Sequence, residues 1–104
     1  MIEMFKKIFG SGADINLKEL IKNGAQIIDV RTTQEYHNGH IPGSVNIPLQ
    51  GLSNNLSKIK KNKPVITCCA SGMRSASASD ILKSHGFTEV YNGGGWMSLQ
   101  HKIS

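Results

Sequence analysis

The sequence predicts an α/β domain with a mainly parallel β-sheet that is covered by helices on both faces. Short apolar runs suited to buried strands alternate along the chain with apolar residues at helical spacing, which is typical of βαβ units. The 104 residues suit one ordinary domain and are too few for two. No repeat or linker interrupts the alternation, so we expect a single domain over residues 1–104, with its core at about 14–100.

The first part of the chain predicts a helix, a buried strand and a second helix. Asp14 precedes three apolar residues at helical spacing, Leu17, Leu20 and Ile21, and Gly24 ends that helix. The short apolar run at 26–30 is suited to a buried strand. Thr32 and Glu35 then fit a capping box, in which each side chain satisfies a free amide at the start of a helix. Capping accounts for the presence of a glutamate at position 35, and we expect the helix to end at 38–39.

The rest of the sequence, from residue 44 onward, predicts three more strands. Residues 44–47 form one, followed by a helical pattern through Leu52, Leu56 and Ile59. The clearest strand is 65–68, and the helix after it ends at Gly86 and has one apolar face: Ala78, Ile81 and Leu82. Another strand covers 87–91, and a final helix begins near Trp96, after three glycines.

Charge and hydropathy exclude several classes of protein. The net charge is +5, but ten of the twelve cationic residues are lysines, whereas planar phosphate recognition usually employs arginine. We therefore expect no nucleic-acid partner. No segment approaches the roughly 20 apolar residues that span a bilayer, and residues 1–10 lack the apolar stretch of a signal peptide. We expect a cytoplasmic protein whose first ten residues form a frayed or packed turn.

Neither a metal nor a cofactor is expected. The three histidines at 37, 85 and 101 form no ligand spacing with each other or with the cysteines. Cys68 and Cys69 are adjacent, so a disulfide between them closes no useful loop. Neither a heptad pattern nor an exposed apolar stripe is evident, and we expect a monomer.

Two polar segments, 29–31 and 69–75, follow strand ends, where ligands collect in open α/β sheets. The second segment leads into the N-terminus of a helix, whose free N–H groups and macrodipole stabilise an anion. For Cys69 this predicts a lowered pKa and a nucleophile at neutral pH. Gly72 lets the loop curl and Arg74 adds a permanent positive charge. The alternative is an inert, buried cysteine before an ordinary turn, and this context favours the functional interpretation.

Three motifs resemble one known family. The segment Cys69-Ala70-Ser71-Gly72-Met73-Arg74-Ser75 resembles the C-x-x-G-x-R-S active-site loop of single-domain rhodaneses. An upstream set of residues resembles the signature of the same family: Asp29-Val30-Arg31, Glu35-Tyr36, Gly39-His40-Ile41-Pro42-Gly43-Ser44 and Asn46-Ile47-Pro48. The stretch 92–96 resembles its Gly-Gly segment before the last helix. Together the motifs cover roughly residues 14–100.

The resemblance implies a sheet of about five strands and ping-pong sulfur transfer. Cys69 would attack the outer sulfur of a donor such as thiosulfate, and a thiol acceptor, or cyanide in an assay, would remove it. N–H groups of the loop would hold the persulfide: Ala70, Ser71, Gly72, Met73, Arg74 and Ser75. Asp29 and Arg31 would support the loop from the neighbouring strand end, and Arg74 would stabilise an anionic donor or orient the loop.

One residue departs from the family pattern. Many members carry a basic residue directly after the cysteine, where this chain has Ala70. Losing a charge beside the sulfur weakens attraction to a small dianion by about 1 kcal/mol in a solvated pocket. We therefore expect thiosulfate to be a poor donor, and a protein or low-molecular-weight persulfide to be used instead.

Cys68 leaves two alternatives open. Counted from Cys68, the spacing to Arg74 is C-x5-R, as in cysteine phosphatases and some arsenate reductases. Strand length favours Cys69, because Pro64 and four strand residues precede it, as in the rhodaneses. Side chains alternate along a strand, so Cys68 should then face the core and act as a small hydrophobe. A Cys68-based phosphatase or arsenate reductase, and a non-catalytic interaction module on the same fold, remain the competing functions.

Overall fold

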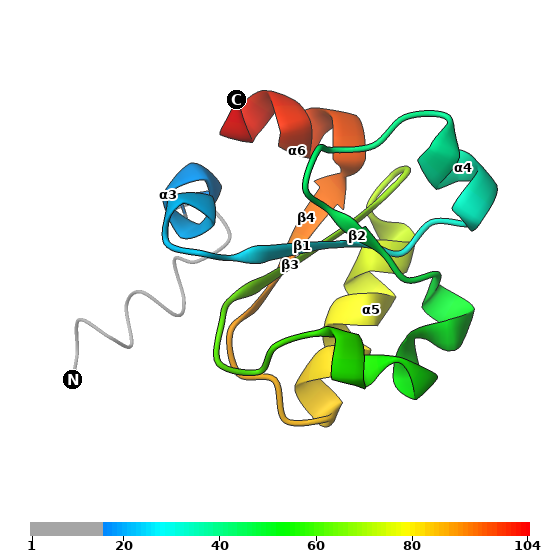
Figure 1. Ribbon diagram of the computed structural model, residues 1–104, viewed down its shortest axis with the longest axis vertical. Coiled ribbons are helices and arrows are strands. Elements are labelled where there is room, and N and C mark those ends of the chain that lie inside the picture. The colour runs from blue at the N-terminus through cyan, green and yellow to red at the C-terminus, as the bar shows by residue number, and fades with distance from the viewer. Residues whose placement is uncertain (1–15) are drawn as a thin grey trace.

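The computed structural model describes residues 16–104, so Asp14 and the turn expected over residues 1–10 lie outside the described residues. Four strands of this part form one sheet in the order β2-β1-β3-β4, and every neighbouring pair is parallel (Figure 1). Their bounds are β1 Gln26–Asp29, β2 Val45–Asn46, β3 Val65–Cys69 and β4 Val90–Gly95. The parallel sheet is confirmed, but within residues 16–104 it has four strands rather than about five.

Helices cover both faces of this sheet, as expected (Figure 1). One face carries α3 (Leu17–Lys22) and α6 (Trp96–Ile103). The other carries α5 (Met73–Ser84) and two short 3-10 helices, η1 (Leu49–Asn54) and η2 (Leu56–Lys58). The short helix α4 (Thr33–His37) follows β1. None of the helices within residues 16–104 is long and apolar enough to cross a membrane.

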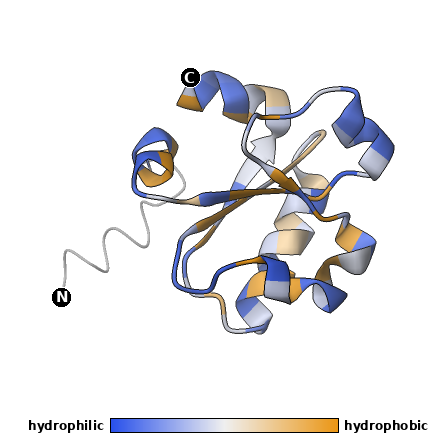
Figure 2. Ribbon diagram, in the orientation of Figure 1, coloured by the Kyte–Doolittle hydropathy of each residue, from blue (hydrophilic) through white to orange (hydrophobic). Residues whose placement is uncertain are grey.

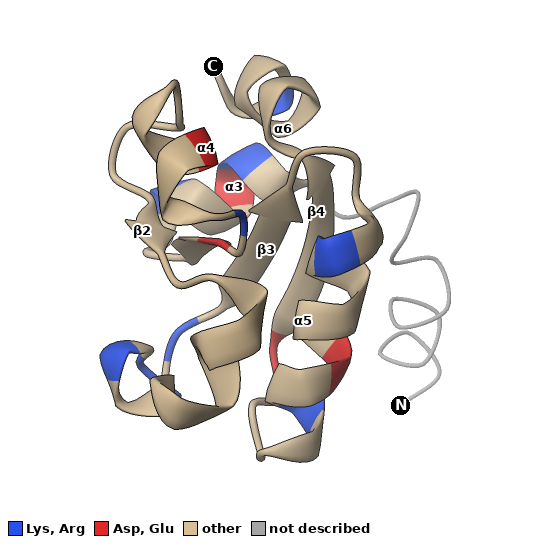
Figure 3. Cartoon of the chain, turned by 90° about the vertical axis from the view of Figure 1, so that its right-hand side faces the viewer, with Lys and Arg blue, Asp and Glu red and all other residues tan. Residues whose placement is uncertain are grey.

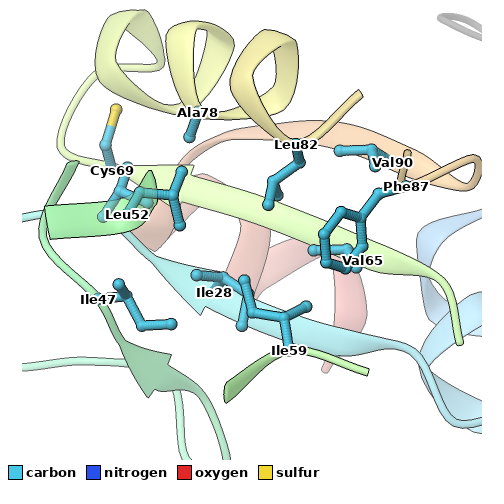
Figure 4. Packing of buried hydrophobic residues seen from close by; sticks show 11 residues of the cluster. Ile28, Ile47, Leu52, Ile59, Val65, Cys69, Ala78, Leu82, Phe87 and Val90 are labelled. Atoms are coloured by element: carbon cyan, nitrogen blue, oxygen red, sulfur yellow. The ribbon is translucent and has the colours of Figure 1, made fainter. Parts of the chain in front are cut away.

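The larger core lies between the sheet and α5. Figure 4 shows its members converging from the strands, from α5 and from the 3-10 region. Its buried residues are Ile28, Val30, Ile47, Leu52, Ile59, Val65, Cys69, Ala78, Leu82, Phe87 and Val90. Apolar colour accordingly runs along the strands (Figure 2). This core fixes α5 over β3, and so fixes the helix that begins beside Cys69.

The second core lies between the sheet and the pair α3 and α6. Its buried residues are Ile27, Ile41, Ile66, Cys68 and Leu99. Adjacent strand residues therefore belong to opposite cores, which is the two-residue alternation of a β-strand. Cys68 faces α6 and Cys69 faces α5, as the sequence predicted from the same alternation.

Two elements differ from the sequence prediction. The helical pattern through Leu52, Leu56 and Ile59 forms two 3-10 helices instead of an α-helix. The last strand begins at Val90 rather than at 87, because Phe87 packs into the larger core and the ladder with β3 starts at the Val65–Val90 pair. The three glycines consequently belong to β4, where a Cβ on Gly93 would lie 2.8 Å from Ile66 Cγ2.

Candidate active site

The chain turns sharply between β3 and α5, directly after Cys69. Gly72 caps the helix in a left-handed conformation, with φ at 107° and ψ at −12°. A side chain with a Cβ rarely adopts such a φ, which is why glycine occupies this position. The turn directs the first N–H groups of α5, which have no partner within the helix, back toward the end of β3.

These N–H groups form a cup around the sulfur of Cys69. The backbone N–H of Gly72 donates to Sγ at 3.0 Å, and the N–H of Ser75 donates at 3.3 Å. The hydroxyl oxygen of Ser75 lies 3.6 Å from the same sulfur. Cys69 has no exposed surface, and Figure 4 shows its sulfur directed toward the loop that enters α5.

The cup favours the thiolate form of Cys69. Burial of the thiol raises its pKa, but hydrogen bonds from the Ser75 side chain and from the N–H groups of Ser75, Gly72 and Ser71 outweigh burial and lower it. The net pKa of Cys69 lies below its ordinary value, as the position at a helix N-terminus predicted. The site can therefore present a nucleophilic sulfur and stabilise an anion bound to it.

The pKa of the neighbouring Cys68 is shifted in the opposite direction. It is fully buried in the second core, beside Ile66 and Leu99. Burial, reinforced by the nearby Asp29 carboxylate, raises the pKa of Cys68 to about 12. The C-x5-R spacing that begins at Cys68 thus lacks an ionised nucleophile.

Comparison with known proteins identifies the chain. The model of the rhodanese-like domain family matches residues 15–102. The chain belongs to the rhodanese family. Its three motifs and the parallel sheet agree with this assignment.

Named relatives of this rhodanese domain include sulfurtransferases. It is 34% identical over 80 residues to the thiosulfate sulfurtransferase GlpE of Pseudomonas savastanoi pv. phaseolicola, covering 77% of this chain and 76% of GlpE. It is 44% identical over 68 residues to the uncharacterized protein YqhL of Bacillus subtilis, covering 65% of this chain. The domain spans about half the length of the first curated relatives that it matches, 54% in the case of YqhL.

A solved structure shows the same fold. The rhodanese from E. coli with bound anions aligns with a TM-score of 0.68 and 34% identity, covering 72% of this chain and 91% of that one. The rhodanese domain thus belongs to a family whose named members include sulfurtransferases.

Asp29 and Arg31 of the rhodanese domain form a buried ion pair. Arg31 Nη2 lies 2.7 Å from Asp29 Oδ2, and the two side chains are 5% and 0% exposed. The guanidinium also donates to the carbonyls of Glu35 and Gly39, at 3.3 and 2.7 Å, and lies over the ring of Trp96. The pair therefore holds α4 and the chain after it against the end of β1, one strand away from Cys69.

Arg74 has a partner that sequence reasoning missed. Its guanidinium donates to both carboxylate oxygens of Glu35, at 2.8 and 3.0 Å. Glu35 also completes the expected capping box with Thr32, so it does more than cap α4. These contacts, with the Arg74 bond first, lower the pKa of Glu35 to about 2. Arg74 thereby joins α5 to α4, and its charge is already paired.

Asn92 is a second residue that the sequence did not single out. Its side-chain oxygen accepts from the Ser75 hydroxyl at 2.6 Å and from the Gly94 N–H at 2.9 Å. It lies on β4, so it reaches the loop from the strand beside β3. Asn92 begins the stretch 92–96 that resembles the Gly-Gly segment of the family, but its contact with Ser75 depends on strand register, which that local pattern does not give.

A run of lysines in the described part of the chain lies away from the loop. The lysines at 60, 61 and 63 precede β3, at the end of the strand opposite to Cys69 (Figure 3). Around the loop, Ala70, Ser71 and Met73 are exposed and carry no charge. No group of three or more His, Cys, Asp or Glu residues within residues 16–104 could hold a metal ion.

Proposed function

We propose that the domain is a sulfurtransferase whose nucleophile is Cys69, which carries sulfane sulfur as a persulfide. One observation carries this proposal: Cys69 Sγ accepts N–H bonds from Gly72 and Ser75 inside the cup. The lowered pKa of Cys69 supplies the thiolate. A persulfide is also an anion, so the same N–H groups suit the loaded state.

The reaction proceeds in two displacements. The Cys69 thiolate attacks the outer sulfur of the donor, the donor S–S bond breaks, and the leaving group departs with the electron pair; thiosulfate would release sulfite. An acceptor thiolate, or cyanide in an assay, then attacks the outer sulfur of the persulfide and regenerates the Cys69 thiolate. Covalent storage splits one difficult transfer into two easier ones.

The preferred donor is a protein or low-molecular-weight persulfide rather than thiosulfate. Ala70 has no charge beside the sulfur, and the Arg74 guanidinium is engaged by Glu35. A small dianion therefore meets little uncompensated positive charge at the loop. The acceptor is a thiol, small or on a protein, and the domain acts as a cytoplasmic monomer, where its two free thiols suit a reducing compartment.

Substitution of Ala70 tests the donor. We expect Ala70→Arg to raise kcat/KM for thiosulfate about fivefold, because one added charge contributes about 1 kcal/mol in a solvated pocket. Asn62→Arg is the matched control, since it adds the same charge in the exposed segment before β3. A high thiosulfate kcat/KM in the wild type, unchanged by Ala70→Arg, would refute this donor preference.

Intact mass after incubation with a donor tests the proposed chemistry. With thiosulfate or glutathione persulfide, we expect the wild type and Cys68→Ser to gain one sulfur atom, and Cys69→Ser to gain none. Loading that needs Cys68 instead, with turnover of an aryl phosphate, would favour a phosphatase. A wild type that takes no sulfur from either donor would favour a non-catalytic interaction module.

A further inference from the structure

The Ser75 hydroxyl lies at the centre of a small polar network beside the nucleophile. Its oxygen is 2.6 Å from Asn92 Oδ1, 3.0 Å from the Gly72 carbonyl oxygen and 3.6 Å from Cys69 Sγ. Ser75 is fully buried. A hydroxyl has one hydrogen, so it can donate fully to only one of these atoms at a time.

The protonation state of Cys69 decides which atom needs that hydrogen. While Cys69 is a thiol, its S–H donates to the Ser75 oxygen, and the hydroxyl hydrogen is free to go to Asn92, its nearest acceptor. When the thiol loses its proton to solvent water, the electron pair stays on Sγ, and the thiolate becomes an acceptor. The Ser75 hydroxyl must then turn toward Sγ and give up the bond to Asn92.

The side chain of Asn92 is held in an orientation that lets its oxygen accept the Ser75 hydrogen while Cys69 is a thiol. Its oxygen also accepts the N–H of Gly94, two residues further along β4, which fixes the orientation of the amide. Gly94 in turn lies close to Gly72, where a Cβ on Gly72 would be 3.5 Å from the Gly94 Cα. β4 thus presents one oriented oxygen to the loop that contains the nucleophile.

We propose that Asn92 is a positioning residue for Cys69: its side-chain oxygen takes the Ser75 hydrogen in the thiol state and yields it to the sulfur when Cys69 ionises. This rests on Cys69 being the nucleophile of the proposed function. The hydrogen bond from Ser75 to Asn92 then favours the thiol form of Cys69, and the hydrogen bond from Ser75 to Sγ favours the thiolate. The Gly72 carbonyl is the remaining competitor for the hydrogen.

A double-mutant cycle on the thiolate titration tests the proposal. The pH dependence of iodoacetamide alkylation, followed by intact mass, reports the pKa of Cys69, with Cys69→Ser as the blank. Asn92→Ala should lower that pKa by about half a unit to one unit, the value of one neutral hydrogen bond. Ser75→Ala should raise it. In the Ser75→Ala background, Asn92→Ala should have no further effect.

The proposal would be overturned if Asn92→Ala shifted the pKa of Cys69 equally with and without the Ser75 hydroxyl. It would also be overturned if Asn92→Ala raised that pKa in the wild-type background. If Asn92→Ala fails to fold, Asn92→Asp keeps both acceptor contacts and should raise the pKa more when Ser75 is intact than in the Ser75→Ala background. Asn62→Ala, at an exposed asparagine far from the loop, should leave the titration unchanged. The titration uses no sulfur donor, so its outcome is independent of whether the chain transfers sulfur.

Discussion

Gly72 combines a conformational role with a chemical one. Its φ of 107° is one that L side chains rarely adopt, and its N–H makes the shortest hydrogen bond to Cys69 Sγ, at 3.0 Å. A Cβ there would meet Gly94 only at 3.5 Å, an ordinary contact. The obstacle to a side chain at this position is therefore backbone strain and not lack of space.

We expect Gly72→Ala to lower the free energy of unfolding by about 1–2 kcal/mol, because alanine is strained in the left-handed conformation. Relaxation of that strain should move the N–H away from Sγ, slow sulfur loading and raise the pKa of Cys69. Gly43→Ala is the control, since Gly43 has φ of 87° and open space around it. Urea unfolding and mass-detected loading measure both effects, and equal loading defects in the two variants would contradict the role of Gly72.

At the scale of elements, α4 and α5 are joined by the Glu35–Arg74 pair. The two side chains are 37% and 36% exposed, so solvent screens the pair and its direct contribution to stability is small. Its geometric consequence is larger, because it ties the first turn of α5, the helix that begins beside Cys69, to the helix that follows β1.

The same pair predicts a pH dependence of stability. The pKa of Glu35 is lowered from 4.5 to about 2 in the folded protein. The stability that ionised Glu35 contributes is therefore fully present above pH 4.5 and is lost as the pH falls toward 2. We expect the difference in unfolding free energy between the wild type and Glu35→Gln to shrink over this interval. Urea titrations at several pH values measure it, with Glu19→Gln on α3 as the control. A difference that stays constant down to pH 2 would argue against the pair.

The whole molecule depends on two cores that share one sheet. Cys69 belongs to the core beneath α5 and Cys68 to the core beneath α6, so the adjacent cysteines lie in different packing environments. Leu82 and Leu99 are the fully buried leucines that α5 and α6 contribute to these cores. Loss of either leaves a cavity on one face of the sheet.

We expect Leu82→Ala and Leu99→Ala each to lower the free energy of unfolding by about 2–5 kcal/mol. Domains have only about 5–15 kcal/mol in total, so the double variant should lose a large part of the stability of the fold. Met97→Ala, at a side chain that is 66% exposed, should change stability by less than about 0.5 kcal/mol. Thermal unfolding followed by circular dichroism tests this, and a small loss in either leucine variant would show that its core repacks.

The sequence by itself determined the features that depend on near neighbours. Alternating apolar runs predicted the parallel α/β sheet, and side-chain alternation placed Cys68 and Cys69 on opposite faces. The capping box at Thr32 and the glycine before α5 are also local patterns, so they could be recognised without a structure. The position of Cys69 at a helix N-terminus follows from the same local order.

Only the tertiary structure decided which distant groups meet around the sulfur. Glu35 and Arg74 are 39 residues apart, and Ser75 and Asn92 are 17 apart. Their contacts depend on strand register and on how α4, α5 and β4 pack, which no pattern of neighbouring residues encodes. The start of β4 and the 3-10 form of residues 49–54 and 56–58 also differ from the local patterns, and Leu52, Leu56 and Phe87 of these segments pack in or against the larger core. Local sequence order thus placed Cys69 at the start of a helix, and long-range packing decided which side chains surround it.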